Sequence, residues 1–212
     1  MANTSDTKLN NYLHGISMFR ISIYLLIILV SFGTMKYCWH HRQYQDELAV
    51  KKFKIMSYAM SVGDLITANT HGVELLNYSN RTPYPRIAAI FLAKILIVEN
   101  KLDEAVNNLR LVINQRKKDS IWHIANLRLA KVLLMQNNLS EAKNVLTLGI
   151  AEKKFSSRYH ELQGDVLFAN QELKAANQEY TKALNNLPQQ VIAPWLNLKV
   201  AETAIDDSNI NN

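Results

Sequence analysis

Small and bulky residues recur along residues 88–187 in a pattern that repeats three times. Each repeat has a pair that ends in a small residue, a second small residue twelve positions later, and a bulky residue four positions after that. The pairs are Leu92-Ala93, Leu129-Ala130 and Gln163-Gly164, the second small residues are Ala105, Ala142 and Ala176, and the bulky residues are Leu109, Leu146 and Tyr180. Antiparallel helices approach closely only where small side chains lie at their crossing and large ones fill the flanks. The pattern therefore predicts repeated helical hairpins and an all-α fold.

The spacing of these hairpins indicates their type. Ala142 follows Ala105 by 37 residues, and Ala176 follows Ala142 by 34 residues. A period near 34 with small residues at two fixed points is typical of tetratricopeptide repeats, which stack as solenoids and usually bind another protein. Because Ala68 precedes Ala105 by the same 37 residues, we expect a degenerate first hairpin before the three clear ones.

Turn-forming residues set the expected limits of the helices. We expect helices at 43–60 and 64–77, a loop at 80–85, hairpins of 86–99 with 102–115, 120–136 with 140–151, and 157–169 with 172–187, and a last helix from Pro194. The helix at 43–60 either continues from an N-terminal span or starts just after it. The helix from Pro194 should cap the end of the stack, and the polar residues 206–212 should fray.

An uninterrupted apolar run lies near the N-terminus. Residues 21–35 carry no charge, and the run reaches Trp39 if Lys36 extends its charged end to the interface. At about 1.5 Å per residue this length just suffices for one transmembrane helix, closed by Arg20 at one end and by an aromatic belt at the other. The alternative is a cleavable signal peptide with Ser31-Phe32-Gly33 as its cleavage site.

The formal net charge of +6 is concentrated around this run. Residues 1–54 hold seven Lys and Arg against three Asp and Glu, an excess that suits anionic membrane lipid. The repeats are nearly balanced in charge, and we expect no nucleic-acid binding. More Lys and Arg follow the run than precede it, which taken alone predicts a cytoplasmic C-terminal domain. A short tail and a single span also suit the opposite topology.

Composition and motifs narrow the class of function. The 212 residues are 48% hydrophobic with only six Gly and four Pro, which favours a folded helical protein. The single Cys38 excludes an intramolecular disulfide. His160-Glu161 begins like a zinc-protease motif but lacks the second histidine, and His40-His41 has no helical ligand spacing. We therefore expect no metal, cofactor, catalytic site or small-molecule substrate, the alternative being a hydrolase with an unrecognised site.

The first helix of each hairpin is expected to line a concave, partner-binding groove. Its predicted residues are Ile87, Ile90, Lys94 and Ile97 from the first hairpin, Ile124, Leu127, Lys131 and Leu134 from the second, and Arg158, Glu161, Asp165 and Phe168 from the third. An apolar surface of this kind marks a protein-binding site. The alternative is that the helix from Pro194 or the helix at 43–60 fills the groove. Arg128 is expected to point off this stripe and to pin neighbouring helices or carboxylates.

Several short motifs are spread over roughly residues 20–205. They are Lys36-Tyr37-Cys38-Trp39, His41-Arg42-Gln43, the segments 100–105 and 126–132, Gln163-Gly164-Asp165-Val166-Leu167, and Leu196-Asn197-Leu198-Lys199. With these motifs the chain resembles the YfgM family, bacterial ancillary subunits of the SecYEG translocon. The resemblance implies an inner-membrane, single-pass protein with a short cytoplasmic tail and a periplasmic repeat domain. It also implies a non-enzymatic scaffold that associates with SecYEG and with the membrane-anchored chaperone PpiD and assists exported proteins.

We follow the resemblance for topology, because Lys and Arg counts carry little weight for one span before a long domain. The alternative function is a cytoplasm-facing, membrane-anchored tetratricopeptide regulator or assembly adaptor. The expected domains are a short tail (1–17), a transmembrane helix (18–39), a juxtamembrane helix with the degenerate first hairpin (40–85), the repeats with their cap helix (86–206), and a disordered tail (207–212).

Overall fold

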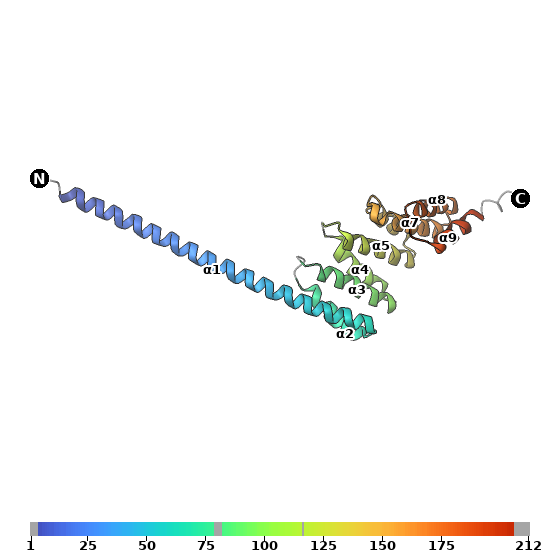
Figure 1. Ribbon diagram of the computed structural model, residues 1–212, viewed down its shortest axis with the longest axis horizontal. Coiled ribbons are helices and arrows are strands. Elements are labelled where there is room, and N and C mark those ends of the chain that lie inside the picture. The colour runs from blue at the N-terminus through green and yellow to red at the C-terminus, as the bar shows by residue number, and fades with distance from the viewer. Residues whose placement is uncertain (1–3, 79–81, 116, 206–212) are drawn as a thin grey trace. The chain divides into compact units, whose positions relative to one another are not determined.

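The computed structural model describes the backbone of residues 4–78, 82–115 and 117–205, and the side chains among these from Ile23 to Ala204 (Figure 1). Over these residues the chain is helical. The helices are α1 (Thr4–Val62), α2 (Leu65–Leu76), α3 (Tyr84–Val98), α4 (Leu102–Ile113), α5 (Ser120–Met135), α6 (Leu139–Thr147), α7 (Ser156–Ala169), α8 (Leu173–Asn185) and α9 (Pro194–Ile205), with a short 3₁₀ turn at Lys153–Phe155 before α7. The predicted all-α fold is confirmed, and the tail predicted at 207–212 lies outside the described residues.

The chain divides into two compact units, Met1–Val50 and Lys51–Asn212. In the first unit, α1 carries the apolar run, and its large side chains from Ile23 to Val30 are all exposed. Within the described residues, one helix, inside Ile23–Val62, is long and apolar enough to cross a membrane, a test that a signal sequence near the N-terminus also passes. The helix is continuous from Thr4 to Val62, so the predicted juxtamembrane helix continues from the apolar run.

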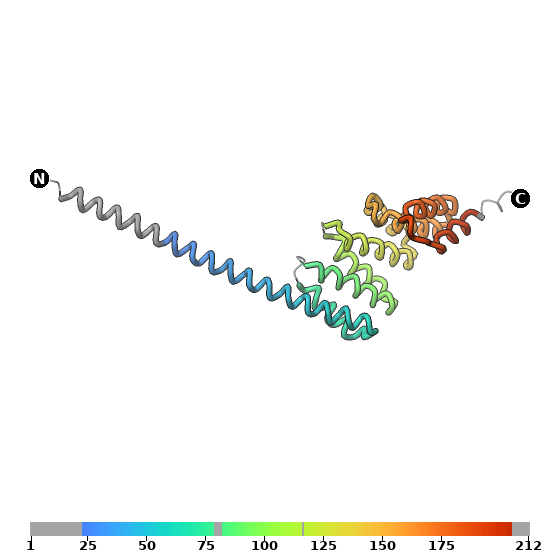
Figure 2. Tube along the Cα trace, in the orientation of Figure 1, coloured from blue at the N-terminus to red at the C-terminus, as the bar shows by residue number. Residues whose placement is uncertain are grey.

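The second unit is a row of helical hairpins in chain order (Figure 2). Residues 51–62 of α1, which belong to this unit, pair with α2 through Met56 and Gly72 and through the ion pair of Lys52 with Glu74. The pairs α3 with α4, α5 with α6 and α7 with α8 follow. The last helix, α9, packs on α8, as expected for a cap. Its Leu196 is 1% exposed and forms a core with Tyr180 and Ala183 of α8.

One left-handed residue closes each hairpin turn. These residues are Gly63, Asn100, Asn137 and Gln171, with φ between 58° and 80°. In every turn the next amide donates to the carbonyl five residues earlier, as Asp64 does to Ala59 and Lys101 to Leu96. This is the Schellman closure, which satisfies carbonyls that the end of a helix leaves free. Gly63 lies 37 residues before Asn100, so the first turn has the geometry of the later ones.

Complementary small and large residues fill the crossing inside each hairpin. The pairs, in chain order, are Met56 with Gly72, Ala93 with Leu109, Ala130 with Leu146, and Gly164 with Tyr180, and all eight residues are buried. A Cβ atom added to Gly164 would lie 2.3 Å from the Tyr180 ring, and one added to Gly72 would lie 3.5 Å from the Met56 sulfur. The first hairpin thus reverses the usual order, with the large residue on its first helix. Because the summed volume is kept, the crossing still packs closely.

Two predicted boundaries were wrong. The loop expected at 80–85 ends earlier, since Tyr84 and Pro85 form the first turn of α3. Proline is tolerated there because first-turn amides have no partner within the helix. The helix expected at 140–151 ends at Thr147, and Gly149 follows it in close contact with Tyr159. A Cβ at Gly149 would lie 2.1 Å from the Tyr159 hydroxyl oxygen.

Candidate functional site

Helices α5 and α7 of the second unit enclose a groove of about 550 Å³. Six of the twelve predicted groove residues line it: Ile124, Leu127, Lys131, Arg158, Glu161 and Asp165. Four further lining residues were not among the prediction: Arg128, Phe155, Leu162 and Lys199. The helical spacing of Ile124, Leu127 and Lys131 brings them to one side of α5.

The other predicted residues lie elsewhere. Ile90 was expected to be exposed, but its side chain is only 6% exposed and belongs to the hydrophobic core. Ile97 and Leu134 are half-buried and pack against the same core. Ile87 is half-buried, and the remaining two, Lys94 and Phe168, are exposed outside this groove. The open surface is therefore shorter than the predicted three-helix stripe.

The floor of the groove is apolar. Ile124 is 39% exposed, and Leu127, Phe155 and Leu162 are half-buried and pack on the core beneath. Ala125 and Leu129 lie on the adjacent, inward-facing side of α5 and are 0% and 2% exposed. The floor is consequently fixed to the core and also presents apolar surface to a ligand.

The acidic end of the groove is occupied by α9. The Lys199 ammonium lies 2.6 Å from an Asp165 carboxylate oxygen and 3.2 Å from Glu161. The Trp195 indole N–H also donates to Glu161, at 3.2 Å. Two side chains of the hairpin add further contacts, Arg158 to Glu161 at 3.3 Å and the Tyr180 hydroxyl to Asp165 at 2.9 Å. The cap helix thus neutralises the charged third stripe and leaves the remaining groove open.

The basic side of the groove has no such partner. Arg128 and Lys131 form no ion pair with any residue that the structure describes. Arg128 was expected to point off the stripe, but it lines the groove and donates to the Ile90 carbonyl at 3.4 Å. The Arg128 side chain is exposed as a whole, although desolvation by the protein around it lowers the pKa of its guanidinium. A cation without a carboxylate partner gains free energy from an anionic ligand.

A buried polar cluster holds α5 against α7 behind the floor. It consists of His123 and Asn126 from α5 and Tyr159 from α7. The Tyr159 hydroxyl lies 2.9 Å from His123 Nδ1 and 3.2 Å from the Asn126 amide, which also donates to the Val145 carbonyl. Burial raises the pKa of Tyr159 to about 12 and lowers the pKa of His123. Both side chains are therefore held neutral, and the role of the cluster is to hold α5 against α7.

A buried ion pair ties α3 to the start of α5. The two terminal guanidinium nitrogens of Arg86, Nη1 and Nη2, each donate to an Asp119 carboxylate oxygen at 2.7 Å, and Arg86 is 4% exposed. The same carboxylate caps α5 by accepting from the Ile121 and Trp122 amides. The Arg86 guanidinium first, with the Trp122 amide, holds the pKa of Asp119 far below its usual range. Spacing along the chain could not predict that Arg86 and Asp119 form this ion pair.

Groups of three or more metal-ligating side chains are absent from the described residues. His160 instead lies 2.7 Å from Glu179 of α8. The groove itself has an apolar floor with Arg128 and Lys131 beside it, which suits binding of a ligand by apolar contact and charge.

Comparison with protein families now adds to this geometry. The family model described as a tetratricopeptide repeat-like domain matches residues 18–204. The chain belongs to the tetratricopeptide repeat-like domain family. This is the domain of YfgM-type proteins, and repeat domains of this kind are typically non-catalytic protein-interaction scaffolds.

Solved structures give the same tetratricopeptide-like fold. The chain is similar to MamA residues 41 to the end from Desulfovibrio magneticus RS-1, with 17% identity, a TM-score of 0.62, and coverage of 76% of this chain and 85% of that one. It is also similar to a MamA RS-1 ArsTM double mutant, with 18% identity, a TM-score of 0.62, and coverage of 75% and 84%. A third structure, titled MamA protein, has 15% identity, a TM-score of 0.60, and coverage of 76% and 82%. No curated protein matches the sequence.

Proposed function

We propose that this protein is a membrane-anchored, non-enzymatic scaffold whose groove between α5 and α7 binds a protein partner. The groove of about 550 Å³ is the observation that carries the proposal, because its apolar floor stays open although α9 packs against one end. Solenoids of helical hairpins bind other proteins on such faces. The expected partners are the SecYEG translocon and a PpiD-like membrane-anchored chaperone, as the family resemblance implies.

The apolar part of α1 is the proposed anchor. Its side chains from Ile23 to Val30 are exposed on every side of the helix, which is costly in water and favourable in lipid. We place the repeats in the periplasm of a bacterium with an inner membrane. This orientation rests on the resemblance and runs against the Lys and Arg asymmetry.

A pair of C-terminal fusions tests the proposed topology and localisation. Alkaline phosphatase is active only outside the cytoplasm, whereas a fluorescent protein of the ordinary kind matures only inside it. We expect phosphatase activity without fluorescence, with the full-length chain retained in the membrane fraction. A soluble, shortened product in the periplasm would indicate a cleaved signal peptide instead and would contradict the anchor.

The second candidate function is a cytoplasm-facing anchored regulator or assembly adaptor. The excess of Lys and Arg after the apolar run is the observation that favours it. Bright fluorescence with silent phosphatase would support this candidate and exclude a periplasmic chaperone as partner. The groove would then serve a cytoplasmic protein.

A further inference from the structure

We propose that the groove between α5 and α7 recognises an acidic peptide segment of its partner that also carries large apolar side chains. This inference rests on the proposed scaffold function and names the chemistry of the ligand. A segment of this kind places its apolar side chains on Ile124 and Leu127, and its carboxylates against Arg128 and Lys131. The occupant is thus a segment of another protein that carries both features within about three turns of helix or an equivalent extended length.

The charges that line the groove indicate the sign of the ligand's charge. Four cations and two carboxylates line the groove. Both carboxylates are already matched, because Lys199 contacts Glu161 and Asp165, and Arg158 contacts Glu161. Arg128 and Lys131 are the two lining cations without a carboxylate partner in the described part of the chain. The free charge of the groove is therefore positive and is confined to its α5 side.

Position links the two cations to the apolar floor. Arg128 follows Leu127 directly, and Lys131 lies seven residues after Ile124, two turns along the same side of α5. A ligand that covers Ile124 and Leu127 must therefore pass beside both cations. Among the described residues, the one acceptor that Arg128 contacts is the Ile90 carbonyl at 3.4 Å, so a carboxylate can form a stronger, charge-assisted bond with it.

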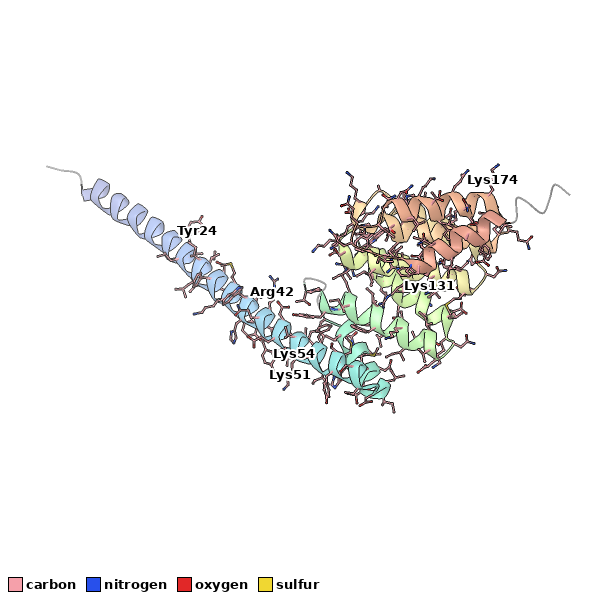
Figure 3. All side chains as sticks on the ribbon, turned by 45° about the vertical axis from the view of Figure 1, so that its right-hand side comes forward. Tyr24, Arg42, Lys51, Lys54, Lys131 and Lys174 are labelled. Atoms are coloured by element: carbon pink, nitrogen blue, oxygen red, sulfur yellow. The ribbon has the colours of Figure 1, made fainter. Side chains whose placement is uncertain are left out.

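Lys174 provides a matched control for charge. It is an exposed lysine on α8 that does not line the groove, and Figure 3 labels it together with Lys131. Lys174→Gln changes the net charge of the protein by the same amount as Lys131→Gln. A ligand attracted only by overall charge responds equally to both substitutions.

The test measures binding of labelled synthetic peptides to the full chain in detergent micelles. The first peptide, of about a dozen residues, combines Leu and Glu. A second has Lys in place of each Glu, and a third has Ser in place of each Leu. We expect only the first to bind, about tenfold more weakly after Arg128→Gln or Lys131→Gln, and unchanged after Lys174→Gln. Arg128→Lys should retain part of the affinity, and unaltered melting temperatures show that the variants are folded.

Three results overturn the inference. They are equal binding of the Lys peptide, equal weakening by Lys174→Gln, and no binding of the Leu and Glu peptide to a folded chain. None of them contradicts the proposed function itself, which is tested by a partner captured at the groove in cells. If a partner is captured but the acidic peptide does not bind, the scaffold function is supported and this ligand chemistry is rejected. Binding of the acidic peptide without a captured partner would support the ligand chemistry of the groove and count against the scaffold function.

Discussion

At the scale of single residues, the closest packing lies where α7 crosses α8. Gly164→Ala places a methyl group 2.3 Å from the Tyr180 ring, which is buried and hydrogen-bonded to Asp165 and therefore has little room to move. We expect a loss of about 3 kcal/mol in the free energy of unfolding. Denaturant unfolding of the chain in detergent measures it.

Gly72 provides the control for this substitution. A Cβ there would lie 2.9 Å from a terminal methyl carbon and 3.1 Å from Cγ of the buried Leu92, which must shift slightly, and alanine gains about 0.5–1 kcal/mol over glycine inside a helix. Gly72→Ala should therefore change stability little. Equal losses at Gly72 and Gly164 would contradict the proposed pairing of small and large residues.

The buried His123 makes stability depend on pH. Desolvation first, with the nearby Lys118, lowers its folded-state pKa below the ordinary value of 6.5, so the unfolded chain binds more protons near that pH. This contribution to stability is complete above the unfolded pKa and is lost as the pH falls through the folded one. The melting temperature should therefore fall between about pH 7.5 and about pH 5.5.

His123→Gln isolates that contribution, because the other histidines remain in the variant. The variant should be less stable at neutral pH, and its melting temperature should change less on acidification. If the two proteins lose melting temperature in parallel as the pH falls, His123 is not the group responsible.

At the scale of helices and turns, the periodicity of small and bulky residues predicted the hairpins well. It gave all three clear hairpins and the degenerate first one, because burial at a crossing restricts side-chain volume strongly. It did not predict that the first hairpin has its large residue, Met56, on the first helix and its small residue, Gly72, on the second. Close packing constrains only the summed volume of the two side chains. The periodicity also missed the Arg86–Asp119 pair, because residues 33 positions apart meet only through the stack.

The groove was half predictable for a related reason. Helical spacing placed Ile124, Leu127 and Lys131 on one side of α5, as the structure shows. The same spacing could not reveal that Ile90 is covered by its neighbours or that Lys199 reaches Glu161. Contacts between a stack and its cap helix depend on where the last loop places that helix.

The turn at Gln171 is the least favourable of the four turns. Its φ of 63° lies in the left-handed region, which glycine adopts freely and asparagine tolerates better than glutamine. Gln171→Gly should raise the free energy of unfolding by about 0.5–1 kcal/mol, and Asn137→Gly by less. Thermal melting of both variants measures this. A lower melting temperature for Gln171→Gly would mean that the glutamine side chain itself stabilises the turn.

At the scale of the whole molecule, the chain combines an apolar N-terminal helix with a row of hairpins that is capped at its C-terminal end. The cap helix has two effects, because Leu196 covers the last hairpin while Lys199 neutralises the acidic end of the groove. The groove that remains is apolar at its floor and basic on its α5 side. These features together are the basis of the proposed scaffold function.

Site-specific photo-crosslinking in living cells tests that function most directly. A photoreactive residue is placed at Lys131 inside the groove or at Lys174 outside it, one position in each full-length protein. We predict a discrete covalent product from position 131, containing a membrane protein of the secretion machinery, and none from position 174. The same product from both positions, or a product from position 174 alone, would contradict the assignment of the groove as the partner-binding site.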